Sequence, residues 1–105
     1  MKRGHLFAPV KKTPEEFFEV IAENFSRASR IERIVSQGHT SPENFWYDQS
    51  EYEFVAVLQG RAEIKFENEN IKMLPGDWII IPPHEKHRVT YTSTEPPCVW
   101  LAVFY

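Results

Sequence analysis

The segment GDWIIIPPHEKHRV, residues 76 to 89, places two histidines on either side of a glutamate, directly after an apolar run and two prolines. Imidazole and carboxylate groups are common ligands of divalent transition metals, so the pattern indicates either a metal site or a polar surface turn. The spacing in HEKH is one residue shorter than in the H-E-x-x-H motif of zinc proteases, and it follows Pro82-Pro83 instead of lying within a helix. We expect His84 at the exposed corner of the turn.

Two segments of the chain resemble the two characteristic motifs of the cupin superfamily. These segments are WYDQSEYEFVAVLQG (46 to 60) and PGDWIIIPPHEKHRV (75 to 89), and the resemblance extends over residues 45 to 104. The residues that carry it are Glu53, Gly60, Gly76, Asp77, Pro82 and His87. The resemblance implies a jelly-roll barrel whose mouth can hold one small ligand. It also implies a metal site, which the family commonly builds from three histidines and a glutamate.

The first motif departs from the family pattern, because Tyr47 and Gln49 stand where an H-x-H pair is expected, with Asp48 between them. Side chains of a strand alternate between its two faces. With regular pairing, Tyr47, Gln49 and Glu53 would all point inward together with His87. With one extra residue in the turn, Asp48 would point inward instead, and Asp48, Glu53 and His87 would form the site. Such ligands suit Zn, Mn, Fe or Ni, and the oxygen-rich version favours Mn or Fe.

A site without metal is the alternative interpretation. Glu53 and His87 would then form a hydrogen-bonded pair inside the barrel, and Tyr47 and Gln49 would complete a polar network. The corresponding function is a non-enzymatic module that binds a small molecule, or a dimerising domain with a vestigial pocket. With metal, the resemblance implies a dioxygenase, isomerase or related metalloenzyme in which Tyr47 could transfer protons. The residues do not decide whether the protein is an enzyme.

Aromatic side chains are expected to line the pocket and exclude water from it. The three candidates are Trp46, Trp78 and Trp100.

An N-terminal helix is predicted over about residues 14 to 25, in KKTPEEFFEVIAENF. Thr13 can serve as N-cap, Pro14 fits the first helical position, and Glu16 completes a capping box. An apolar stripe at helical spacing follows, which predicts a helix that covers the core or a subunit contact. The members of the stripe are Phe17, Phe18, Ile21, Ala22 and Phe25.

Short strands separated by Gly, Pro and Asn are predicted from about residue 29 to the end of the chain. The predicted strands are 29 to 37, 44 to 47, 53 to 59, 61 to 67, 71 to 74, 78 to 82, 87 to 93 and 98 to 105. The fold class expected is therefore an all-β, antiparallel jelly-roll barrel with one short N-terminal helix, forming a single domain over residues 1 to 105.

The amino-acid composition limits the classes of binding partner that the protein can have. Twelve Lys and Arg scattered among fifteen Asp and Glu give a net charge of −3, which does not provide the basic stripe needed for nucleic acid. No signal peptide or membrane span is recognisable, so a cytoplasmic location is expected. The single Cys98 is expected to be a buried hydrophobe. The runs WIIIP (78 to 82) and CVWLAVFY (98 to 105) are apolar on both faces, which favours a homodimer.

Overall fold

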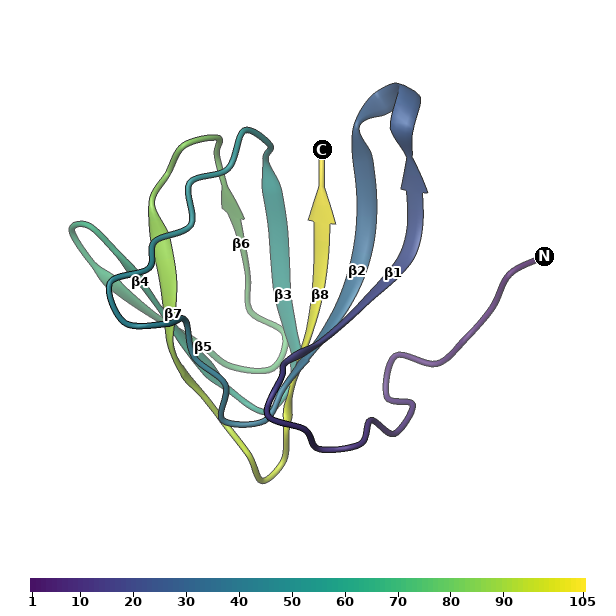
Figure 1. The fold of residues 1–105 in the computed structure, drawn as a ribbon, viewed down its shortest axis with the longest axis horizontal. Coiled ribbons are helices and arrows are strands. Elements are labelled where there is room, and N and C mark those ends of the chain that lie inside the picture. Colours follow the sequence, from purple (N-terminus) through teal and green to yellow (C-terminus); the bar gives the residue numbers. More distant parts are fainter.

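Two antiparallel β-sheets make up the fold, and the computed structural model describes all of residues 1–105 (Figure 1). One sheet has five strands in the order β1-β2-β8-β3-β6, and the other has three in the order β5-β4-β7. The strands are β1 (Phe17–Asn24), β2 (Ser29–Ser36), β3 (Glu53–Gln59), β4 (Ala62–Phe66), β5 (Asn70–Met73), β6 (Trp78–Ile81), β7 (His87–Thr92) and β8 (Cys98–Phe104). The only helical element is the 3-10 turn η1 (Phe25–Arg27), and no helix is long and apolar enough to cross a membrane. The expected all-β antiparallel architecture is confirmed.

The strands lie where β-branched and aromatic residues dominate, and turn residues separate them. Gly60, between β3 and β4, has a φ of +76°. A Cβ at this position would lie 2.5 Å from the hydroxyl oxygen of Ser93 and 2.7 Å from the carbonyl oxygen of Pro97. Only glycine fits this turn, because it combines a positive φ with close contact to the loop between β7 and β8. The expected strand at 44 to 47 is reduced to one bridge, between Tyr47 and His87.

The hydrophobic core lies between the two sheets and draws residues from both. Its eleven members are Val55, Val57, Ala62, Ile64, Phe66, Met73, Ile81, Cys98, Trp100, Ala102 and Phe104. Cys98 is fully buried, and burial raises the pKa of its thiol to about 12. Its thiolate is therefore not accessible at neutral pH, as expected for a structural cysteine.

The helix predicted over residues 14 to 25 is wrong, because this segment forms β1, which pairs with β2 from Phe17 to Asn24. The hydroxyl of Thr13 donates to the carbonyl oxygen of Glu15 at 2.8 Å. No backbone N–H donates to this hydroxyl, so Thr13 does not serve as an N-cap. Phenylalanine, valine and isoleucine also suit a strand, and the free edge of β2 offers this segment a full ladder of hydrogen bonds. A bulge between Val20 and Ala22 lets the apolar spacing fit a strand.

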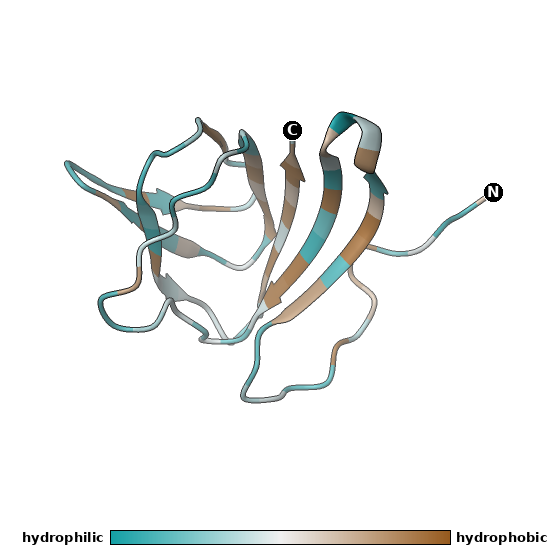
Figure 2. Cartoon of the chain, turned by 45° about the horizontal axis from the view of Figure 1, so that its top comes forward, coloured by the Kyte–Doolittle hydropathy of each residue, from teal (hydrophilic) through white to brown (hydrophobic).

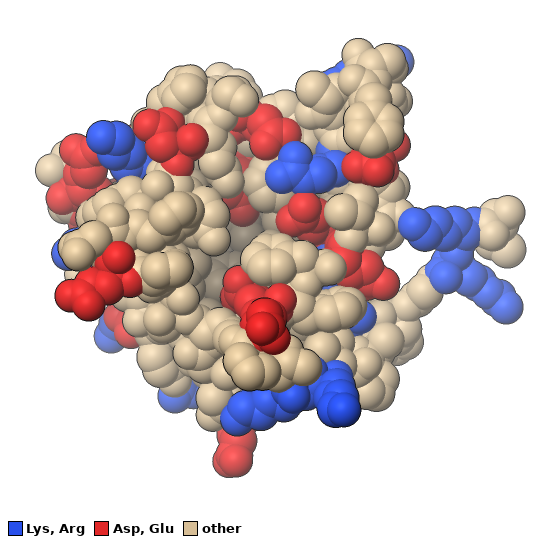
Figure 3. All heavy atoms as spheres, in the orientation of Figure 1, with Lys and Arg blue, Asp and Glu red and all other residues tan.

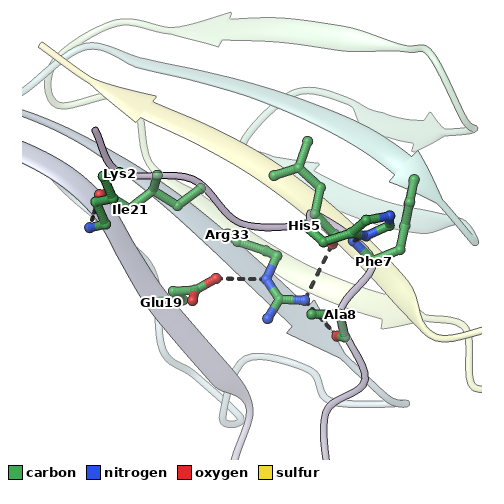
Figure 4. A network of polar contacts seen from close by, with 8 residues as sticks. Lys2, His5, Phe7, Ala8, Glu19, Ile21 and Arg33 are labelled. Carbon is green, nitrogen blue, oxygen red and sulfur yellow. Dashed lines mark hydrogen bonds and ion pairs between the residues drawn. The ribbon is translucent and has the colours of Figure 1, made fainter.

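The segment before β1 lies against the outer side of the five-stranded sheet, where Arg33 of β2 holds it (Figure 4). The Arg33 side chain is only 4% exposed and pairs with Glu19 at 2.8 Å. It also donates to the carbonyl oxygens of Leu6 at 3.3 Å and Ala8 at 2.9 Å. A buried guanidinium needs such partners, so the N-terminal segment covers this part of the sheet in place of the expected helix.

The rest of the outer side of this sheet carries apolar side chains, several of them exposed, and Figure 2 shows hydrophobic residues along its strands. We call this surface the outer apolar face, and it consists of Ile31, Phe54, Trp78, Ile80, Leu101 and Val103, which are cross-strand neighbours. Trp78 remains 59% exposed although its ring stacks on that of Phe54 at 5.7 Å. Exposed apolar patches of this kind are typical of interaction surfaces. The homodimer expected from the sequence thus stays a prediction, with this face as the surface to test.

We expect Trp78→Lys to convert the protein from a dimer of about 25 kDa, twice 12.4 kDa, into a monomer. A lysine ammonium would have to be desolvated at the centre of a dimer interface. Sedimentation equilibrium at high micromolar concentration measures the mass. Phe25→Lys is the matched control, since Phe25 is 84% exposed on η1 and lies outside the outer apolar face. A wild-type protein that is monomeric under these conditions contradicts the prediction.

Candidate functional site

A pocket opens between the inner faces of the two sheets, and we call it the central pocket. Counted to its open mouth, it contains about 560 Å³ of empty space. Nine of its fourteen lining residues are hydrophobic. The other five are Glu16, Glu32, Gln49, Glu53 and His87. The pocket is thus an apolar cleft with a few polar groups, which is the usual composition of small-molecule sites.

The sheet registers bring Glu53 and His87 face to face across the pocket. Glu53 is the first residue of β3 and pairs with Ile81 on one side and Phe104 on the other. His87 is the first residue of β7 and pairs with Phe66 of β4. The two strands belong to different sheets, yet Nε2 of His87 lies 3.8 Å from Oε1 of Glu53. The two side chains are only 6% and 10% exposed.

His87 presents a free lone pair to the pocket. Its Nδ1–H donates to the carbonyl oxygen of Glu85 at 2.8 Å, which leaves Nε2 as the acceptor in the neutral ring. Burial lowers the pKa of His87, outweighing the Glu85 carbonyl that raises it, so the ring is neutral at pH 7. The ring stacks on Tyr47 with centroids 5.4 Å apart, and two backbone hydrogen bonds between these residues fix the arrangement.

Glu53 is a carboxyl group that titrates near neutral pH. Burial is the main cause that raises its pKa to about 7, and nearby Glu32 and Glu51 raise it further. The amide of Gln49, which donates to Oε1 at 3.1 Å, and the charge of Arg30 act in the opposite direction. Near pH 7 Glu53 is therefore about half protonated and can donate or accept a hydrogen bond.

Tyr47 and Gln49 also line the pocket, together with Glu53 and His87, as regular alternation would place them. Burial, and then the charges of Glu16 and Glu53, raise the pKa of the Tyr47 phenol, so it is a neutral hydrogen-bond donor at pH 7. Asp48 points away from the pocket, and its Oδ1 lies 2.7 Å from Nδ1 of His84 at an exposed corner. The alternative arrangement, with Asp48 inside, is not formed.

Among the lining residues that were not predicted from the sequence are Glu16, Phe18 and Glu32. Glu16 and Phe18 were assigned to the helix, although their i, i+2 spacing also fits one face of a strand. Glu32 has the same i, i+2 spacing to Ile34 in β2, which places both on one face of the strand and was a usable signal. Of the three tryptophans expected in the lining, only Trp100 is there. The expectation for Trp46 and Trp78 is wrong, because Trp78 lies on the outer apolar face and Trp46 contacts the guanidinium of Arg88.

The residues of the pocket fit a metal ion only in part. No three side chains of His, Cys, Asp or Glu converge to hold one. Tyr47 is a neutral phenol and Gln49 donates its amide to Glu53. A gap of 3.8 Å between Nε2 and Oε1 is too long for a hydrogen bond, but an ion about 2.1 Å from each atom could bridge it. The metal ligands named from the sequence therefore stay a prediction.

Two antiparallel sheets with a pocket between their inner faces define a β-barrel of the jelly-roll type. The family model described as "Cupin domain" matches residues 32–104, and the chain belongs to the cupin family. No curated protein matches the chain.

Solved structures extend the comparison beyond the family model. A candidate mannose-6-phosphate isomerase of Ralstonia eutropha JMP134 is 43% identical, with a TM-score of 0.91, over 98% of this chain and 96% of the other. A cupin superfamily protein of Desulfitobacterium hafniense DCB-2 is 16% identical, with a TM-score of 0.74, over 91% and 82% of the two chains. KdgF of a Halomonas species is 16% identical, with a TM-score of 0.72, over 90% and 82%. The last two support the fold alone.

The raised pKa of Glu53 predicts a pH-dependent stability. Between about pH 4.5 and 7 the folded carboxyl keeps a proton that the unfolded chain has lost, so the free energy of unfolding falls as pH rises. We expect wild type to lose about 2 kcal/mol more than Glu53→Gln between pH 5 and pH 8, measured by urea unfolding. The lowered pKa of His87 has the opposite effect, a loss of stability below about pH 6.5, but this is common to both proteins. If the free energy of unfolding depends on pH in the same way for both proteins, the prediction is contradicted.

Proposed function

We propose that the protein binds a small molecule in the central pocket, without a resident metal ion, through Glu53 and His87. The proposal rests on the arrangement of these two side chains. The two groups face each other at 3.8 Å, neither hydrogen-bonds the other, and both are nearly buried. Oε1 of Glu53 accepts from Gln49, but Nε2 of His87 has no hydrogen-bond partner. Buried polar groups are normally hydrogen-bonded, so a ligand that donates to Nε2 would supply the missing partner.

The chemistry of the ligand follows from the groups that would contact it. Nε2 of His87 accepts a hydrogen bond, Glu53 accepts or donates one, and the phenol of Tyr47 donates one. A hydroxyl or amine on the ligand satisfies these groups. The hydrophobic remainder of the lining, such as Ile64 and Trp100, would contact an apolar part of the same molecule.

If the protein is an enzyme, one observation favours an isomerase. The 43% identical protein of R. eutropha is named as a candidate mannose-6-phosphate isomerase. Isomerisation of an aldose to a ketose requires a group that removes a proton from one carbon and returns a proton to the next. A carboxyl group with a pKa of about 7 can do both at neutral pH, and Glu53 has this property. Tyr47 would donate a hydrogen bond to the carbonyl oxygen of the substrate.

A divalent metal ion is the second candidate for the polar end of the pocket, favoured by the free lone pair of His87 and its distance from Glu53. His87 and Glu53, with Gln49, are the residues that would hold it. Such an ion would polarise a ligand oxygen. This set contains only one imidazole and one carboxylate, and the amide of Gln49 already donates to Glu53. Catalytic zinc sites typically have three His, Cys, Asp or Glu ligands, which is why we favour the metal-free pocket.

We expect compounds that bind this pocket to raise the melting temperature of the protein in the presence of EDTA. A library of metabolite-sized compounds, screened by thermal denaturation, provides the measurement. Glu53→Ala should abolish the shift, because it removes a buried partner of the ligand. His84→Ala is the matched control, since His84 lies at the exposed corner outside the pocket. Binding that survives Glu53→Ala, or that requires added metal, contradicts the proposal.

We also expect purified protein to carry less than about a tenth of an equivalent of Mn, Fe, Ni or Zn, because a site with one imidazole and one carboxylate provides too few ligands. Elemental analysis after incubation with each metal and gel filtration measures this. His87→Ala is analysed beside wild type. One equivalent of metal that His87→Ala removes would establish the metal site in place of the proposal. A genuine site should also lose affinity below about pH 6.5, as imidazole becomes protonated.

A further inference from the structure

The charges of the central pocket are all of one sign. Three carboxylates line it, those of Glu16, Glu32 and Glu53, and no lysine or arginine does. In Figure 3 acidic side chains gather around the middle of the face, and most basic side chains lie at its periphery. We propose that the pocket selects small organic cations, whose ammonium group is held by Glu16, Glu53 and the aromatic rings of the lining. This inference deepens the proposed function and rests on it.

Glu16 is positioned by a relay of hydrogen bonds that starts in the core. The indole N–H of Trp100 donates to the hydroxyl of Ser36 at 3.0 Å, and this hydroxyl donates to Oε2 of Glu16. Ser36 and Trp100 are buried, so the relay fixes the carboxylate at the pocket wall. No basic side chain forms an ion pair with Glu16, and its negative charge is therefore available to a ligand.

The basic residue nearest to the pocket carboxylates is already paired. Arg30 donates from Nε to Glu32 and from Nη1 to Glu51, both at 2.9 Å, and its guanidinium lies 4.0 Å from the centre of the Phe104 ring. Arg30 with Glu32 and Glu51 carries a net charge of −1, so an anionic ligand that approaches Arg30 also meets these two carboxylates. Two glutamates thus offset Arg30, while Glu16 and Glu53 have no basic partner except the neutral His87.

His87 provides an independent indication of a ligand. Its side chain is 6% exposed, lines the pocket and has no hydrogen-bond partner at Nε2. A lone pair in this position calls for a donor, and either an ammonium N–H or a hydroxyl on the ligand can provide it. A phosphate dianion or a carboxylate group has no proton to donate, and it would face the pocket carboxylates as well.

Aromatic rings complete the site. Phe18, Tyr47, Trp100 and Phe104 all line the pocket. The face of an aromatic ring attracts a cation, and rings arranged around a pocket are a recurring means of binding ammonium ligands. Carboxylates and aromatic rings in one pocket therefore favour an organic cation over a neutral molecule of the same shape. They disfavour the sugar phosphate after which the R. eutropha protein is named.

The test uses two probes of one shape, choline and 3,3-dimethylbutan-1-ol. The alcohol has a carbon in place of the quaternary nitrogen of choline. Both carry the hydroxyl that His87 requires, so only the charge differs. We expect titration calorimetry at pH 8 to give at least tenfold tighter binding for choline, and no measurable binding for mannose 6-phosphate. Raising the salt from 20 to 500 mM should weaken binding of choline and leave the alcohol unaffected.

Glu16→Gln should reduce the preference for choline several-fold, because the amide oxygen can still accept from Ser36 while the charge is lost. Glu69→Gln is the matched control, because Glu69 is an exposed residue of the turn before β5 and lies outside the pocket.

Equal or tighter binding of the alcohol, or of mannose 6-phosphate, overturns the inference and leaves the binding function intact. If no probe binds while the compound library yields hits that depend on Glu53, the selectivity alone is wrong. If the library also yields none, the proposed function fails with it.

Discussion

The convergence of a carboxyl group and an imidazole from two different sheets is the constraint on which the rest of this site depends. Glu53 is placed by two neighbouring strands of the larger sheet, and His87 by its pairing with Phe66 and by the bridge to Tyr47. A shift of either register by one residue would turn its side chain out of the pocket. The core between the sheets fixes both registers at once, so the packing that stabilises the fold also positions the pair.

This position is costly for both side chains. Desolvation raises the pKa of Glu53 and lowers that of His87, so at neutral pH burial favours the uncharged form of each group. Glu53 and His87 would form an ion pair only if the attraction between the two charges exceeded the free energy needed to desolvate both of them. Instead the two groups remain 3.8 Å apart. The site therefore keeps an unused acceptor and a carboxyl of variable charge, which a ligand can exploit.

Much of the fold could be predicted from the sequence, and so could the meeting of Glu53 and His87. Most strands were recognisable because Gly, Pro and Asn separate runs of β-branched and aromatic residues, and the family motifs carried both site residues. The failure at residues 14 to 25 had a physical cause, since local capping and periodicity lost to the long-range ladder with β2. That one error also concealed Glu16 and Phe18, because a residue's face depends on whether its segment is helix or strand.

The similarity to the R. eutropha protein and the charge of the pocket favour different ligands. Whole-length similarity to the R. eutropha protein reports mainly on the backbone, and a fold is compatible with many ligands. The charge of a ligand is decided by the few side chains that meet it. Here Arg30 is paired with Glu32 and Glu51, so a phosphate that approaches it meets two carboxylates as well as the guanidinium. An anion could enter only by breaking these ion pairs or by meeting unpaired carboxylates, and either route costs free energy that a cation does not have to overcome.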